Sequence, residues 1–139
     1  MRKWEAHVKR KAILLVGVAL VAMAATPAEA VSFPQYPGRV KNADFSAGAF
    51  QSKGDYVGAL DFAADGKSAV TRWKTDYGRS GRCWDTNGAQ NGFTACNYNM
   101  KENRFIKFQV CHANYGSSSY SKCSEWSPWV SIRNGVEKG

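Results

Sequence analysis

Polar and apolar residues alternate through much of the chain beyond residue 54. Residues 55–62 alternate strictly between two faces, which is the period-two pattern of a β-strand. The dipeptide Asp65-Gly66 suits a tight two-residue turn, and residues 69–75 are rich in β-branched and aromatic side chains. We therefore predict a first hairpin from residues 55–62 and 69–75.

Further strands are predicted toward the C-terminus, separated by turns rich in glycine, asparagine and serine. They lie at residues 82–85, 93–98, 104–112 and about 123–132. The third of these has the clearest pattern, with Ile106, Phe108 and Val110 on its inward face. Cys111 falls on the opposite face, so its disulfide is expected away from the aliphatic core.

The region between residues 31 and 54 has scattered aromatic residues, prolines and glycines but no clear period. It predicts a partly ordered arm that adds at most one edge strand. Residues 55–139 then form the folded domain, and they show no helical period. About six strands at hairpin spacing predict the all-β class, as a small antiparallel β-sandwich or a small barrel.

The first 30 residues carry the pattern of an export signal. A basic segment precedes the apolar run 12–25, whose 14 residues are fewer than the roughly 20 that a membrane-spanning helix needs. Ala28-Glu29-Ala30 follows as a cleavage site, and no cysteine lies near it for lipid attachment. We predict a helical signal peptide at residues 1–30, no membrane anchor, and a secreted, extracellular protein.

Four cysteines follow the signal, an even number in a chain sent to an oxidising compartment: Cys83, Cys96, Cys111 and Cys123. Two disulfides are expected, and three connectivities are open. We favour Cys83 with Cys96 and Cys111 with Cys123, because each pair encloses a short hairpin-like segment. A zinc site is disfavoured, since there is no Cys-x-x-Cys pair and residues 31–139 hold a single histidine.

Positive charge is concentrated in the middle of the chain. Residues 31–139 retain 14 of the 19 Lys and Arg and 9 of the 11 Asp and Glu, a net charge of +5. Eight basic and three acidic residues lie between positions 67 and 107. Such a surface favours acidic extracellular partners, although a basic strip also occurs as an ordinary solvated face. The candidate ligand-binding residues are Arg72, Trp73, Arg79, Arg82, Trp84 and Lys107.

Catalysis has little support in the sequence. General acid-base or nucleophilic chemistry needs a base beside a reactive partner, and His112 is the only imidazole after the signal. Strand parity places His112 on the core face next to Val110, which favours a half-buried structural role. Asp85 and Glu102 could form a glycosidase-like pair, but both lie next to predicted turns. We predict no enzyme activity, catalytic residue, metal or cofactor.

Trp126-Ser127-Pro128-Trp129 is the one unusual motif. With the preceding strand it resembles the last hairpin of fibronectin type III domains of the cytokine-receptor type, which end in Trp-Ser-x-Trp-Ser. That resemblance implies a fold and a ladder of alternating tryptophans and basic side chains. Arg72, Lys74, Arg104 and Lys107 could supply the cations. The alternative arrangement has Trp126 in the core and Trp129 on the sheet exterior.

The cysteine-containing segments also resemble those of small secreted actinobacterial β-proteins with disulfides and no established activity. The matching segments are Gly81-Arg82-Cys83, Cys96-Asn97-Tyr98, Val110-Cys111 and Cys123-Ser124-Glu125-Trp126. This resemblance implies a disulfide-stapled β domain and no particular chemistry.

The function predicted from these patterns is a non-enzymatic, monomeric binding module for an extracellular or cell-wall ligand, either an acidic polymer or a glycan. Nucleic acid is a less favoured partner. The first alternative is a small secreted inhibitor of an extracellular enzyme, which would present its two disulfide-bridged segments as rigid loops. An antimicrobial role is weaker, because there is no amphipathic helix and the charge is moderate.

Overall fold

The computed structural model describes residues 38–139, which form two antiparallel four-stranded sheets, so the predicted all-β fold is confirmed. The first sheet has the order β1 (Gly38–Ala43), β2 (Ser46–Gln51), β3 (Tyr56–Asp61), β6 (Thr94–Asn97). The second has the order β5 (Ser80–Trp84), β4 (Ser68–Thr75), β7 (Phe105–Ala113), β8 (Val130–Ser131). The predicted signal peptide lies outside the described residues.

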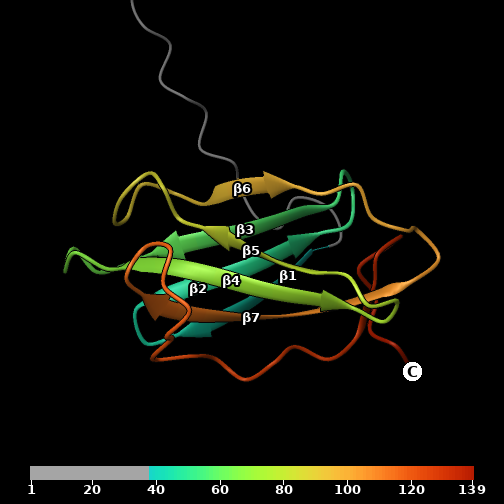
Figure 1. The fold of residues 1–139 in the computed structure, drawn as a ribbon. Coiled ribbons are helices and arrows are strands. Elements are labelled where there is room, and N and C mark those ends of the chain that lie inside the picture. Colours follow the sequence, from blue (N-terminus) through green and yellow to red (C-terminus); the bar gives the residue numbers. More distant parts are fainter. Residues whose placement is uncertain (1–37) are drawn as a thin grey trace, which may run out of the picture.

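The two sheets pack face to face as a sandwich. Figure 1 shows β4, β5 and β7 crossing in front of β1, β2 and β3. Strand β2 packs against β4 and β7, and β3 packs against β4. The inner faces meet in a core whose largest fully buried members include Phe50, Val57, Ile106 and Phe108. Ile106, Phe108 and Val110 face inward and Cys111 outward, as the strand parity predicted.

The predicted first hairpin is wrong, although both of its strands exist. Strand β3 pairs with β2 and β6, whereas β4 pairs with β5 and β7, so residues 62–67 carry the chain from one sheet to the other. Asp65 and Gly66 do make a turn there, with Gly66 at a φ of 78° and the Asp65 carboxylate accepting the Lys67 N–H. A turn sequence bends the chain locally but does not select the partner of a strand.

The prediction of a partly ordered arm at residues 31–54 is also corrected, because the described part of this region forms two complete strands. Strand β2 is buried along its whole length and lies inside the first sheet. The sequence signal was weak because Ala47, Gly48 and Ala49 have low β propensity. Their small size is what the packing needs: a Cβ on Gly48 would lie 2.7 Å from Thr71 Oγ1 and 2.9 Å from Val110 Cβ.

The predicted last strand is shorter than expected, since only Val130–Ser131 is regular. The segment 123–129 still runs beside β7, but serine side chains replace part of the ladder. Ser124 N–H donates to the Val110 carbonyl while Val110 N–H donates to Ser124 Oγ. Ser127 and Phe108 exchange the same pair of bonds. Moving three residues along this segment, from Ser124 to Ser127, therefore corresponds to moving two residues along β7, from Val110 to Phe108. A repeat of three residues is typical of the polyproline II conformation.

Both favoured disulfides are present, and they have different structural roles. Cys83–Cys96 joins β5 of the second sheet to β6 of the first. Cys111–Cys123 ties the outer face of β7 to the start of the segment 123–129. All four cysteines are oxidised, so none is free to bind a metal. Two disulfides in so small a domain fit an extracellular location.

Candidate functional site

The outer face of the second sheet gathers four cationic side chains, which we call the cation platform: Arg72, Lys74, Arg82 and Lys107. Sheet register brings them together. Arg72 is the cross-strand partner of Arg82, and Lys74 is the cross-strand partner of Lys107. Residues two apart on a strand share a face, so Arg72 and Lys74 join these two pairs along β4. Segments far apart in sequence thus form one charged surface.

Three aromatic rings hold the platform cations in place. The Arg72 guanidinium lies 4.5 Å from the Tyr120 ring centroid and 5.6 Å from that of Trp126. Lys74 Nζ lies 4.8 Å from the Trp126 ring, and Lys107 Nζ lies 4.8 Å from that of Trp129. Cation-π contacts of this kind are worth roughly 0.5–2 kcal/mol each. They restrict long side chains that would otherwise be disordered, while leaving their charge intact.

The segment 123–129 positions both tryptophans on this face. Ser124 and Ser127 turn toward β7, where their side chains are bonded. With a period of three, Trp126 and Trp129 fall together on another side of the segment. Both indoles are half-buried against the sheet exterior. The alternative arrangement with Trp126 in the core is therefore wrong, and the predicted alternation of tryptophan with cations is present at Arg72, Lys74 and Lys107.

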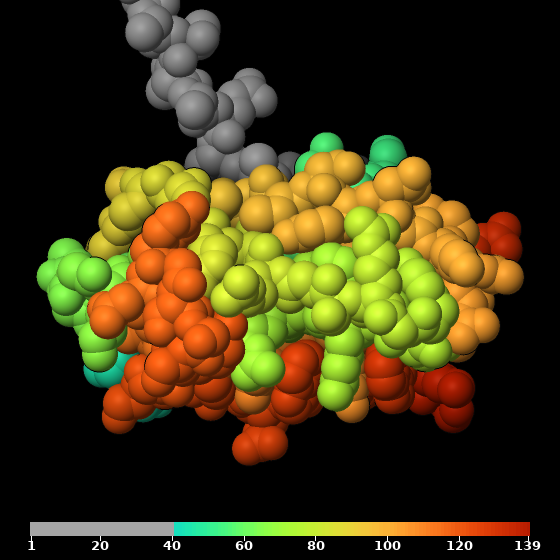
Figure 2. All heavy atoms as spheres, in the orientation of Figure 1, coloured from blue at the N-terminus to red at the C-terminus, as the bar shows by residue number. Residues whose placement is uncertain are grey.

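The platform charges are not neutralised by the protein itself. Among residues 38–139 no carboxylate lies within salt-bridge distance of the four cations. Their hydrogen bonds go to neutral groups: Arg72 donates to Gln109 Oε1, and Arg82 donates to Tyr120 Oη and the Ser117 carbonyl. Figure 2 shows this face, with β4 and β5 in yellow-green between the orange loop after β7 and the red C-terminal segment.

A hollow of about 390 Å³ lies in the platform between β5 and the aromatic side chains. Platform cations and aromatic rings account for most of its walls, and the edge strand contributes two small residues. Its lining is Arg72, Trp73, Lys74, Ser80, Gly81, Arg82, Tyr120 and Trp126. Ser80 leaves this part of the surface low because its side chain is short, whereas Gly81 contributes backbone, since a Cβ on Gly81 would meet the Trp73 ring in the core.

The structure brings together three of the six predicted contact residues: Arg72, Arg82 and Lys107. Trp73 belongs to the core, where it is 2% exposed and where Gly81 leaves room for its ring. Arg79 lies over the Trp73 ring and donates to the Asn99 carbonyl. Trp84 is half-buried on the cluster of Val70, Cys111 and Ala113.

Sequence reasoning missed Tyr120 and left Lys74, Trp126 and Trp129 out of the predicted contact set. The parity of β4 was the available signal for Lys74, because it lies two residues from Arg72. No such signal existed for Tyr120. It reaches the platform only because the loop after β7 folds back, with the His112 and Ser121 backbones bonded to each other.

Arg104, the fourth cation considered for the ladder, lies elsewhere. Its Nε is 3.0 Å from Asp76 Oδ1, and its guanidinium lies 5.9 Å from the Tyr77 ring. Partial desolvation acts to raise the pKa of Asp76, but hydrogen bonds from Phe105 N–H and Arg104, together with the Arg104 charge, outweigh it. The pKa of Asp76 is therefore lower than usual, and Arg104 is paired while the platform cations are not.

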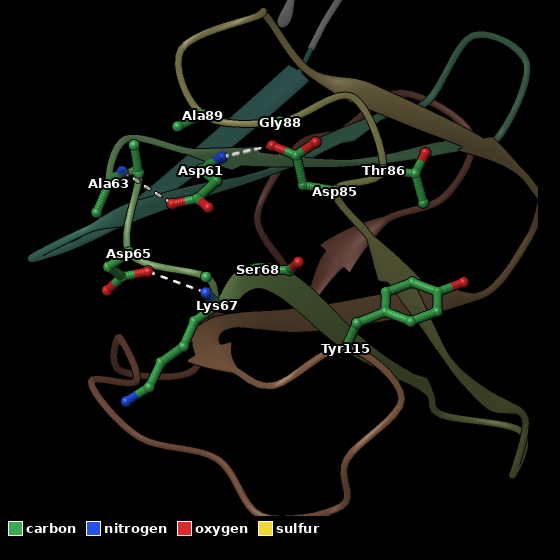
Figure 3. Close-up of a pocket in the computed structure, with 12 residues that line it drawn as sticks. Asp61, Ala63, Asp65, Lys67, Ser68, Asp85, Thr86, Gly88, Ala89 and Tyr115 are labelled. Carbon is green, nitrogen blue, oxygen red and sulfur yellow. Dashed lines mark hydrogen bonds between the residues drawn. The ribbon is translucent and has the colours of Figure 1, made fainter.

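A second hollow, of about 470 Å³, lies at one end of the sandwich, and we call it the end pocket. Figure 3 shows Asp61, Asp65 and Asp85 in its wall, with Tyr115 at another border. The carboxylates support the surrounding loops: Asp85 accepts the Asp61 and Asn87 N–H groups, and Asp61 accepts that of Ala63. The Asp61 and Asp85 carboxylates in this wall are therefore already engaged in hydrogen bonds that stabilise the surrounding loops.

The predicted chemical candidates do not assemble into a catalytic site in the described structure. His112 is buried on the inner face, with Nε2 3.4 Å from Asp65 Oδ1 and 3.7 Å from Asp61 Oδ1. It is more deeply buried than the half-buried position predicted. Asp85 lines the end pocket, whereas Glu102 lies in an exposed turn outside its lining. The glycosidase-like pair is therefore not formed.

Residues 38–139 contain no cluster of three or more histidine, cysteine or acidic side chains arranged to hold a metal ion. The same residues contain no helix long and apolar enough to cross a membrane.

Comparison of the chain with family models, curated proteins and solved structures gives no match. The cation platform is therefore the candidate site on structural grounds alone.

Proposed function

We propose that this protein is a secreted, non-enzymatic binding module that uses its cation platform to bind an anionic extracellular or cell-wall ligand. One observation carries the proposal: four cations share an exposed sheet face with no carboxylate partner among the described residues. Uncompensated positive charge on a rigid surface attracts anions, and aromatic support lowers the entropy lost when they bind.

The export pattern of residues 1–30 and the two disulfides support placing this ligand outside the cell. The ring contacts also favour charge recognition over sugar stacking. Trp126 has three cations within 6 Å of its centroid, so much of its ring is already occupied. Acidic groups on the ligand, more than sugar faces, are therefore what the platform recognises.

Kinship with fibronectin type III domains of the cytokine-receptor type is a separate proposal, about fold alone. It is supported by the serine-bonded segment 123–129 and by the alternation of tryptophan with basic side chains. It carries no receptor function to this chain.

The proposed function is tested with dextran sulfate and uncharged dextran, using the full chain exported to an oxidising compartment. We expect capture by dextran sulfate alone, weakening as salt is raised, because exposed charge interactions are screened. Lys74→Gln with Lys107→Gln should weaken binding about 25-fold at low salt, at roughly fivefold for each cation.

Lys53→Gln with Lys67→Gln is the matched control. It removes the same charge from exposed turns outside the platform, so its effect should be within about twofold, reflecting only long-range attraction. Equal losses in both double variants would show that net charge alone is responsible, and the platform would no longer be the site.

A further inference from the structure

We infer that the ligand is a linear polymer with one oxyanion about every 5–7 Å, lying along a diagonal line of cations across the second sheet. This inference rests on the proposed function and adds the shape and charge spacing of the ligand. We call the line the diagonal stripe. It consists of the four platform cations and one further lysine, in the order Arg82, Arg72, Lys74, Lys107 and Lys138.

The register of the sheet sets the direction of the stripe. Arg82 on β5 lies opposite Arg72 on β4, and Lys74 on β4 lies opposite Lys107 on β7. Lys74 lies two residues after Arg72 on β4. From each of these four cations to the next, the stripe therefore either crosses to the neighbouring strand or moves two residues along the same strand. Phe105 lies two residues before Lys107, and Lys138 Nζ is 5.0 Å from its ring centroid. The stripe thus runs from the β5 edge toward β8.

Strand geometry gives the spacing of the strand positions that carry four of these five charges. Directly opposite residues on neighbouring strands have Cβ atoms about 5 Å apart. Residues two apart on one strand are separated by about 6.7 Å along it. A single small anion can therefore contact only part of the stripe, whereas a chain with regularly repeated charges contacts it successively. The hollow beside Arg72 and Arg82 provides space for such a chain.

The aromatic contacts favour a polymer without nucleobases. Proteins that bind single-stranded nucleic acid stack the bases on exposed aromatic faces. On this face the protein's own cations lie over Tyr120, Trp126 and Trp129. Phosphodiester-linked polyols and polyuronates share the required chemistry, a repeated oxyanion on a flexible chain. Arginine pairs such as Arg72 and Arg82 suit both phosphate and carboxylate oxygens.

The test measures affinity as a function of chain length, using the oxidised full chain after export. The probes are oligo(glycerol phosphate) and oligogalacturonate of one to ten units, thymidine oligonucleotides of equal charge, and dextran sulfate as the general polyanion. We expect affinity in at least one of the first two series to rise about 100-fold or more up to about five units, then to level off. Whichever series shows the rise identifies phosphate or carboxylate.

Arg82→Gln with Lys138→Gln removes the two ends of the stripe, which lie too far apart to contact one small anion together. This variant should bind ten-unit oligomers about 25-fold more weakly. The Lys53→Gln, Lys67→Gln variant serves as the control, with an expected change within about twofold.

Four results would overturn the inference. Equal affinity for one and five units would indicate a compact anion site, and stronger binding of thymidine oligonucleotides would indicate nucleic acid. If dextran sulfate bound but affinity did not rise with length in either oligomer series, the proposed function would stand. The inference of a linear polymer lying along the diagonal stripe would then be wrong. Absence of binding to every probe, dextran sulfate included, would remove both.

Discussion

At the scale of single residues, Asp55 shows how burial decides the behaviour of a side chain. Its carboxylate is buried at the β2–β3 turn, where Oδ2 accepts the Met100 N–H at 2.9 Å and Oδ1 has no partner. Desolvation raises the pKa of Asp55, and the opposing effects of the Met100 hydrogen bond and the Arg79 charge do not cancel it. The residue also has a φ of 54°, which asparagine tolerates as well as aspartate.

Asp55→Asn should therefore gain stability relative to the wild type as pH rises from about 4 to 7. The folded pKa of Asp55 lies above its unfolded value, so its favourable contribution is complete below the unfolded pKa and is lost as pH rises through the folded one. Asparagine keeps the oxygen that accepts the Met100 N–H and does not ionise. Urea unfolding of both proteins at several pH values tests this, and a difference independent of pH would contradict it.

At the scale of secondary-structure elements, the segment 123–129 shows how a chain follows a strand without forming a regular ladder. Ser127 accepts the Phe108 N–H and donates its hydroxyl proton to the Pro128 carbonyl. Ser124 does the same between Val110 and Glu125. Each serine satisfies a β7 donor that would otherwise be buried without a partner, and this holds Trp126 over the platform.

Ser127→Ala should lower the free energy of unfolding by about 1–3 kcal/mol, because it leaves the buried Phe108 N–H without an acceptor. Ser131→Ala is the matched control. Ser131 is half-exposed and bonds Val136 through its backbone, so its change should stay within about 0.5 kcal/mol. Chemical denaturation measures both, and equal effects would show that the Ser127 hydroxyl is not needed.

At the scale of the whole molecule, the two sheets are joined by packing of their inner faces and by one covalent link. Thr71 Oγ1 donates to the Gly58 carbonyl across the interface, and Gly48 keeps that interface close. Cys83–Cys96 connects β5 to β6 and so spans the two sheets. Cys111–Cys123 staples the outer face of β7 alone.

Replacing Cys83 and Cys96 with alanine should reduce the unfolding free energy by about 3 kcal/mol, mainly because the unfolded chain gains conformational freedom. The Cys111–Cys123 disulfide closes a loop of nearly equal length, so the Cys111→Ala, Cys123→Ala variant should lose a similar amount of unfolding free energy. It should also weaken dextran sulfate binding, because Cys123 begins the segment that carries Trp126. Losses below about 1 kcal/mol in both variants would contradict this account.

The sequence by itself determined the properties that depend on neighbouring residues. Alternation predicted most strands and the inward face of β7, and short cysteine spacing predicted both disulfide pairs. These predictions succeeded because strand period and loop closure act over a few residues.

Only the tertiary structure decided which strands pair and which distant side chains meet. The Asp65-Gly66 turn predicted a hairpin, yet β3 and β4 lie in different sheets because their partners come from elsewhere in the chain. Strand β2 was not predicted because a glycine at position 48 weakens the local β pattern. Glycine is needed there because a Cβ would collide with Thr71 and Val110 on the facing sheet. Tyr120 and Trp126 reach Arg72 through long-range packing. Such contacts are set by sheet register and burial, and no local pattern encodes them.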